Sequence, residues 1–213
     1  MSATILAVAQ QKGGAGKTTI AVQLGVWWAS QGKRVNLLDV DPQGSMKAWH
    51  GLREEAGIAG HPSAWDVPGW KLSSEIDRLK SDSDIIIVDT PPHAETDARV
   101  AVRAAGLILV PVQPSPMDWW ATKPTIDMAA KEKTRALLVL NRLPARGKLG
   151  DAIRAKINEA KLPVATATLG NRSAFATSMM EGKGVAETQP RSIAAAEIQA
   201  LASEIEKLLK KSG

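Results

Sequence analysis

The sequence QQKGGAGKTT occupies residues 10–19 and decides the fold. An apolar run at residues 5–9 precedes it, and a segment with helical apolar spacing begins at Ile20. A strand, a glycine-rich loop and a helix in this order form the arrangement that binds phosphate groups. The glycines let the backbone turn tightly and bring its N–H groups close to phosphate oxygens. The first turn of the helix adds unpaired N–H groups and the positive end of its dipole.

Two side chains of this loop have a predicted role at the phosphates. Lys17 can reach the β- and γ-phosphates, and the Thr18 hydroxyl can ligate Mg²⁺. The loop also departs from the standard pattern, because Gln11 stands where a glycine is usual and an extra lysine, Lys12, precedes the paired glycines. The pattern Lys-Gly-Gly-x-Gly-Lys-Thr resembles the deviant Walker A motif of the ParA/MinD family of ATPases. The resemblance implies ATP and Mg²⁺ as cofactors, and it implies that Lys12 reaches across a homodimer to the partner's nucleotide.

Apolar runs along the chain predict the fold class. Strand-like runs lie at residues 5–9, 35–38, 85–88, 107–112 and 137–140. Helix-like stretches lie at residues 18–30, 74–80, 96–105, 121–133, 149–160 and 190–211. Continuous apolar strands that alternate with helices predict a doubly wound α/β fold, a mostly parallel sheet flanked by helices, in one domain over residues 1–213. The segment 57–70 is rich in Gly, Pro and Trp and predicts an irregular excursion.

The second motif is acidic and follows the second predicted strand. Residues 39–44 read Asp-Val-Asp-Pro-Gln-Gly, and a carboxylate just past a strand end can orient water or support a metal ion. Taken alone, these residues could also form an ordinary acidic turn. The run resembles the second motif of the ParA family. By that resemblance Asp41 positions the attacking water, and Asp39 supports the metal and the loop.

The third motif ends the third predicted strand, where an apolar run at residues 85–88 is followed by Asp89. This order is typical of a Walker B carboxylate, which holds Mg²⁺ or its shell of water. The predicted metal ligands are therefore Thr18, Asp39 and Asp89, and the predicted catalytic residues are Lys12, Lys17 and Asp41.

The ends of the next two strands complete the predicted nucleotide site. A stiff proline-rich segment, residues 111–118, resembles one that contacts nucleotide and the partner subunit in small ParA-like proteins. An amide after the fifth strand can bind adenine, as the family often does at this position. The residues expected to contact nucleotide are Gly13, Gly14, Ala15, Gly16, Lys17, Thr18, Thr19, Pro114, Asn141 and Arg142.

Composition limits the class of protein. The chain has no cysteine, which excludes disulfides and cysteine-ligated metal and argues against relatives that carry an iron–sulfur cluster. The N-terminus predicts no signal peptide, and no apolar run is long enough for a membrane span. We therefore expect a cytoplasmic protein.

The net charge of +5 permits attraction to DNA or to an anionic membrane. By resemblance, basic residues near the C-terminus bind nonspecific DNA, and they could equally form a solvated basic surface. The candidates are Arg172, Lys183, Arg191, Lys207, Lys210 and Lys211. The helix over 190–211 lacks Phe and Trp on its apolar face, which favours packing over membrane binding.

The resemblance is closest to small ParA proteins without an N-terminal extension, so specific operator binding is not expected. It implies a slow hydrolase of ATP to ADP and phosphate that dimerises on Mg-ATP and binds nonspecific DNA of the nucleoid. A cargo adaptor or centromere-binding protein would stimulate hydrolysis, and the cargo would be a plasmid, a chromosome region or a protein cluster. The alternatives are a MinD-like regulator bound to membrane through the C-terminal helix and an inactive scaffold.

Overall fold

The computed structural model describes residues 3–92 and 95–210, so Lys211 lies outside the described residues. Within these ranges one sheet contains six parallel strands in the order β3-β2-β4-β1-β5-β6. The strands are β1 (Thr4–Val8), β2 (Val35–Asp39), β3 (Ser63–Asp66), β4 (Ile85–Asp89), β5 (Leu107–Val112) and β6 (Ala136–Leu140). Residues of β2, β4 and β5 are all buried, as expected for strands covered on both faces. The predicted doubly wound α/β fold is confirmed.

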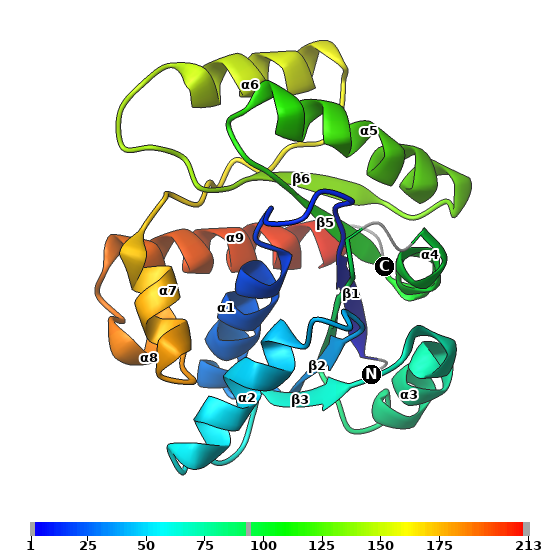
Figure 1. Cartoon of the computed structure of the whole chain (residues 1–213), viewed down its shortest axis with the longest axis vertical. Helices are drawn as coiled ribbons and strands as arrows, with labels where there is room; N and C mark the ends of the chain where they lie inside the picture. The colour runs from blue at the N-terminus through cyan, green and yellow to red at the C-terminus, as the bar shows by residue number, and fades with distance from the viewer. Residues whose placement is uncertain (1–2, 93–94, 211–213) are drawn as a thin grey trace.

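Helices cover both faces of the sheet (Figure 1). The helices are α1 (Lys17–Ser30), α2 (Ser45–Glu55), α3 (Leu72–Leu79), α4 (Glu95–Ala104), α5 (Pro116–Lys131), α6 (Leu149–Glu159), α7 (Ser173–Met180), α8 (Val185–Thr188) and α9 (Ile193–Lys210). Figure 1 shows α1, α7, α8 and α9 on one side of the strands and α3 and α4 on the other. None of the helices in the described part of the chain is both long and apolar enough to cross a membrane.

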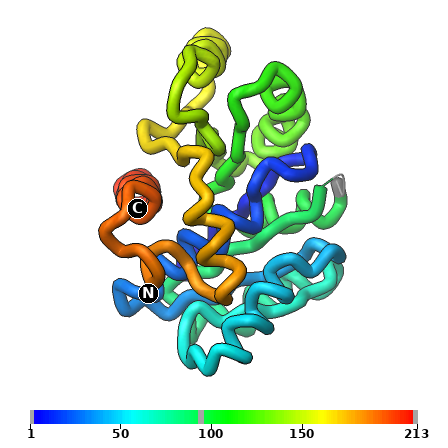
Figure 2. The backbone as a smooth tube through the Cα atoms, turned by 60° about the vertical axis from the view of Figure 1, so that its left-hand side comes forward, coloured from blue at the N-terminus to red at the C-terminus, as the bar shows by residue number. Residues whose placement is uncertain are grey.

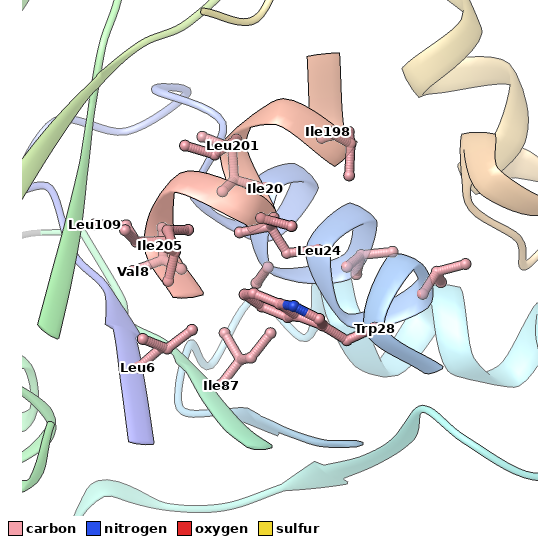
Figure 3. Close-up of a cluster of buried hydrophobic side chains, with 14 of the residues drawn as sticks. Leu6, Val8, Ile20, Leu24, Trp28, Ile87, Leu109, Ile198, Leu201 and Ile205 are labelled. Carbon is pink, nitrogen blue, oxygen red and sulfur yellow. The ribbon is translucent and has the colours of Figure 1, made fainter. Parts of the chain in front are cut away.

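The core on the α1 side joins the start of the chain to its end. Figure 3 shows Trp28 of α1 pointing into a cluster with the apolar side chains of α9 and of the central strands. Trp28 is buried, and its indole Nε1 donates to the Glu206 carboxylate of α9 at 2.7 Å. Ile198, Leu201 and Ile205 of α9 are likewise buried, so α9 is a packing helix of the core, as predicted. Figure 2 views α9 (red) almost end-on, beside the segment that carries α7 and α8.

The structure corrects three expectations about the elements. The excursion over 57–70 contains β3, a four-residue edge strand that pairs with β2 in parallel register. This strand is half exposed and has no apolar run, so its sequence carried no strand signal. Helices α2, α7 and α8 were not expected. Helix α5 begins at Pro116 rather than at residue 121, because Ser115 caps it and a proline suits its first turn.

Candidate functional site

The site lies at the carboxyl ends of the central strands, where a parallel α/β sheet binds ligands. At this edge Thr18, just after the loop, contacts Asp89 at the end of β4, and the loop itself contacts Asn141 just after β6. Asp39 ends β2 and lies opposite Asp89 in the pairing of β2 with β4. A cavity of about 470 Å³ opens there. Its lining residues are Gly13, Gly14, Gly16, Lys17, Thr18, Thr19, Asp41, Gln43, Ser45, Pro92, Arg142 and Met179.

The sequence predicted eight of these lining residues, from the glycine-rich loop, the acidic motif and the end of β6. It missed Gln43, Ser45, Pro92 and Met179. Gln43 and Ser45 could have been found, since they directly follow Asp41 in the acidic motif. Met179 belongs to α7, far along the chain, and no motif marked it.

The glycine-rich loop is held by two side-chain amides from neighbouring strands. Gln113 Nε2 donates to the Gly14 carbonyl at 2.7 Å, and Asn141 Nδ2 donates to the Ala15 carbonyl at 2.8 Å. Gly14 and Gly16 have φ of 73° and 92°, backbone conformations that residues other than glycine rarely adopt. With these carbonyls engaged, the loop has a fixed shape in which its N–H groups can serve a phosphate.

Asn141 therefore has a contact that the sequence did not indicate. Its Oδ1 accepts from the Arg142 backbone N–H at 2.9 Å, so both ends of its amide bind the protein. It is buried behind the loop, and Ala15 is buried with it. The adenine contact predicted for Asn141 and the nucleotide contact predicted for Pro114 stay predictions, since neither residue lines the cavity.

Lys17 and Asp89 form the buried charged centre of the site. The Thr18 hydroxyl donates to Asp89 Oδ2 at 2.5 Å, while Asp89 Oδ1 has no hydrogen-bond partner among the described residues. Burial raises the pKa of Asp89 to about 7, and the nearby Asp39 and Asp41 carboxylates add to the rise. Burial also lowers the pKa of Lys17, against the attraction of Asp89 and Asp41. A buried carboxylate with an unpartnered oxygen beside a hydroxyl fits Mg²⁺, which prefers oxygen ligands.

Asp39 organises the turn that carries Asp41. Its Oδ1 accepts from the Asp41 N–H at 3.1 Å, and its Oδ2 accepts from the N–H groups of Met46 and Lys47 at 3.1 and 3.2 Å. The last two groups belong to the first turn of α2, which otherwise lacks a side-chain cap. Burial raises the pKa of Asp39 in spite of these bonds. Its predicted metal role stays a prediction.

Asp41 faces the cavity and is half buried. Its Oδ1 accepts from the Gln43 N–H at 3.0 Å, which fixes the carboxylate at the start of the turn. A carboxylate in this position is within reach of water in the cavity, as a residue that orients a nucleophile needs to be.

Lys12 is not among the residues that line this cavity, and it forms an ion pair with Asp118 of α5. Of the predicted DNA-binding residues, Arg172 pairs with Glu197 at 2.6 Å and Lys183 pairs with Glu181 at 3.3 Å. The Glu197 hydrogen bond raises the pKa of Arg172. Arg191, Lys207 and Lys210 are exposed. Binding of DNA by any of these residues stays a prediction.

Comparisons with known proteins show what the whole chain is similar to. The family described as the CobQ/CobB/MinD/ParA nucleotide binding domain matches residues 6–185. The chain is 32% identical to the maintenance of carboxysome distribution protein A of Halothiobacillus neapolitanus, over 94% of this chain and 95% of that protein. It is 33% identical to the chromosome-partitioning ATPase Soj of Thermus thermophilus, over 51% of this chain and 54% of that protein. Among solved structures, the cell division ATPase MinD of Pyrococcus furiosus matches with a TM-score of 0.79 and 25% identity, over 96% of this chain and 99% of that one.

Proposed function

The chain belongs to the CobQ/CobB/MinD/ParA nucleotide-binding family, and we propose that it is a ParA-type ATPase that distributes a cargo inside the cell. One observation carries the proposal: the glycine-rich loop, Lys17 and Asp41 line one cavity at the carboxyl ends of the strands, and the buried Asp89 is joined to it through Thr18. These are the parts that phosphoryl transfer from ATP requires. An inactive scaffold would have no need of the complete set.

The residues have separate tasks in the proposed hydrolysis. The loop N–H groups and Lys17 bind the β- and γ-phosphates, and Thr18 and Asp89 would hold Mg²⁺, which supplies neutralising charge when bound. Asp41 orients a water molecule toward the γ-phosphorus. The water oxygen forms a bond to phosphorus and the bond between phosphorus and the bridging oxygen of ADP breaks. Both water protons leave with the phosphate product, which then exchanges them with solvent.

The active form in this proposal is a homodimer closed around two ATP molecules. Lys12 of each copy then reaches the phosphates of the partner subunit, where its charge stabilises the transfer. A dimer also joins two basic surfaces, and doubling the phosphate contacts strengthens binding to nonspecific DNA. A partner protein that carries the cargo would stimulate hydrolysis and release the dimer locally. We place this cycle in the cytoplasm, on the nucleoid.

The relatives help to choose the cargo. The carboxysome distribution protein matches this chain from end to end, whereas the Soj match covers about half of it. This difference favours a large protein body as the cargo over a chromosome region or a plasmid.

Turnover of Mg-ATP by the purified protein tests the enzymatic part. Lys17→Ala should lose ATP binding, because it removes the only lysine among the residues that line the described cavity. The matched control is Asp77→Ala, which removes an exposed aspartate of α3 and should leave turnover unchanged. Unchanged ATP affinity in Lys17→Ala would show that the phosphate site is wrongly placed.

The membrane-bound alternative gains no support from α9. Ile198, Leu201 and Ile205 of this helix are buried in the core that α9 shares with α1 and the sheet, while Ile193 at its start is exposed. Membrane binding through the buried residues would require α9 to leave the core. Co-sedimentation of the whole chain with anionic liposomes, with and without ATP, tests this alternative. We expect no ATP-dependent binding to liposomes.

A further inference from the structure

Asp118 is a buried carboxylate that the proposed hydrolysis does not use. It lies in the first turn of α5, with 1% of its side chain exposed. Its Oδ2 accepts from the Ser115 hydroxyl at 2.8 Å and from Lys12 Nζ. Its Oδ1 has no hydrogen-bond partner within residues 3–92 and 95–210. The hydrogen-bond partners of this carboxylate among the described residues are therefore one hydroxyl and one lysine, and Lys12 is the one cation among them; the N-terminal end of α5 adds only a partial positive charge.

The two members of this ion pair differ in exposure, so separating them has a different cost for each side chain. The Lys12 side chain is 38% exposed, so its ammonium group can turn to water when it leaves. Asp118 cannot do so, because α5 and its cap enclose it. Removing the cation from a buried ion pair leaves an uncompensated charge, which is strongly unfavourable. Lys12 is thus held in its own subunit chiefly because its departure would leave the buried Asp118 carboxylate without a cation.

We infer that Asp118 is a positioning residue that holds Lys12 in its own subunit and so restrains closure of the ATP-bound dimer. The inference rests on the proposed function, since it takes Lys12 to be the residue that crosses to the partner's nucleotide. Two copies must each release a Lys12 before the dimer can close. The pair therefore sets the protein concentration at which ATP produces dimers.

This restraint has a quantitative signature. If Lys12 is released in only a fraction of the subunits, the apparent affinity of dimerisation is multiplied by that fraction twice, once for each of the two subunits. Neutralising Asp118 should raise the released fraction by about tenfold, the effect of roughly 1.4 kcal/mol. The dimer dissociation constant should then fall by about 100-fold, the square of that factor.

The experiment uses the full chain with the isosteric substitution Asp118→Asn. The matched control is Asp127→Asn on the same helix, whose pair with Lys123 at 2.8 Å has side chains 50% and 78% exposed. An exposed pair of this kind contributes little. If Asp118→Asn folds poorly, Asp118→Ser removes the carboxylate without adding volume to the buried position.

Two measurements follow each variant. The first is the rate at which an amine-acylating reagent modifies Lys12 in nucleotide-free protein, read by mass spectrometry. The second is the dimer dissociation constant with a slowly hydrolysed ATP analogue, from analytical ultracentrifugation. We expect Lys12 of Asp118→Asn to react about tenfold faster and dimers to form at about 100-fold lower concentration, with no change for Asp127→Asn.

A third variant separates positioning from general structure. In a Lys12→Ala background, Asp118→Asn should not promote dimers, because no lysine remains to be released. Promotion of dimers in that background would overturn the inference, since Asp118 would then act without Lys12.

The remaining outcomes are also decisive. An unchanged acylation rate at Lys12 would show that Asp118 does not hold it, and the ATPase proposal would stand. Faster acylation with unchanged or weaker dimerisation would overturn the restraint on closure. Absence of dimers in every variant, wild type included, would refute the proposed dimer and with it the restraint, while the acylation rate would still report whether Asp118 holds Lys12.

Discussion

Replacing Gly16 by alanine tests how the phosphate loop is held. Gly16 has φ of 92° and forms the N-cap of α1. A Cβ at this position would overlap the amide nitrogen of Asn141, the atom that donates to the Ala15 carbonyl. The substitution therefore adds backbone strain and also displaces the side chain that fixes the loop.

Gly32 provides the matched control. Its φ is 78°, so alanine meets a similar backbone strain, but a Cβ there has nothing within 4 Å. The left-handed conformation costs alanine about 1–2 kcal/mol, and the stiffer unfolded chain returns about 0.4–1 kcal/mol. We expect Gly32→Ala to lower the free energy of unfolding by roughly 1 kcal/mol.

Gly16→Ala should cost more than the control. Displacing Asn141 leaves buried amide and carbonyl groups without partners, which adds about 1–3 kcal/mol to the strain. The total is roughly 2–4 kcal/mol, or a fall in melting temperature of roughly 4–16 °C for a chain of this size. The lost hydrogen bond is one that holds the phosphate loop, so ATP affinity should fall together with stability.

Urea denaturation of nucleotide-free protein and calorimetric titration with an ATP analogue measure both effects. We expect Gly32→Ala to bind the analogue like the wild type and Gly16→Ala to bind it weakly. Equal losses of stability at the two glycines would contradict the role given to Asn141, since its side chain would then be displaced without loss of stability.

Three further predictions concern single carboxylates. Asp41→Ala should still bind ATP and dimerise but turn over at least about 100-fold more slowly, as measured by phosphate release, and normal turnover would remove Asp41 from its role. The folded-state pKa of Asp89 is raised from 3.8 to about 7, so nucleotide-free protein should lose stability as pH rises between these values. Asp89→Asn should abolish this loss. The contrary result is a melting temperature that depends on pH in the same way in both proteins from pH 4 to pH 8. Glu187→Gln leaves the buried Arg53 without its carboxylate partner at 2.8 Å and should cost about 3 kcal/mol in urea denaturation, whereas Glu75→Gln in the half-exposed pair of α3 should cost under about 1 kcal/mol. Similar costs at the two glutamates would contradict the burial argument.

The parts of the molecule that the sequence predicted are those with a strong local signal. Continuous apolar runs marked the central strands, and the spacing of QQKGGAGKTT placed the loop between β1 and α1. Asp41 and Asp89 were found because each follows an apolar strand, and a parallel sheet brings its carboxyl ends to one edge. In the structure both carboxylates attract the Lys17 ammonium group and oppose the lowering of its pKa by burial, and their catalytic and metal roles stay predictions.

The parts that the sequence did not predict depend on contacts between distant residues. Strand β3 is held by pairing with β2 and by the Trp65 indole, which donates to Asn36 at 2.7 Å, rather than by its own apolar residues. Asn141 was expected to bind adenine, but its contact with the Ala15 carbonyl arises only when β6 lies beside the loop. Asp118 ends the proline-rich segment 111–118, but nothing in that segment indicated its burial or its pairing with Lys12, which follow from where α5 packs.

Binding to nonspecific duplex DNA tests whether the chain is an ATPase whose ATP-bound dimer attaches to the nucleoid. The wild-type protein and Lys12→Ala are compared with ADP and with a slowly hydrolysed ATP analogue, across a series of salt concentrations. We expect binding that requires the ATP analogue, weakens steeply with salt and is lost in Lys12→Ala, because only the ATP dimer joins two basic surfaces. Binding that is equal with ADP and the ATP analogue, or absent with both, would contradict this expectation.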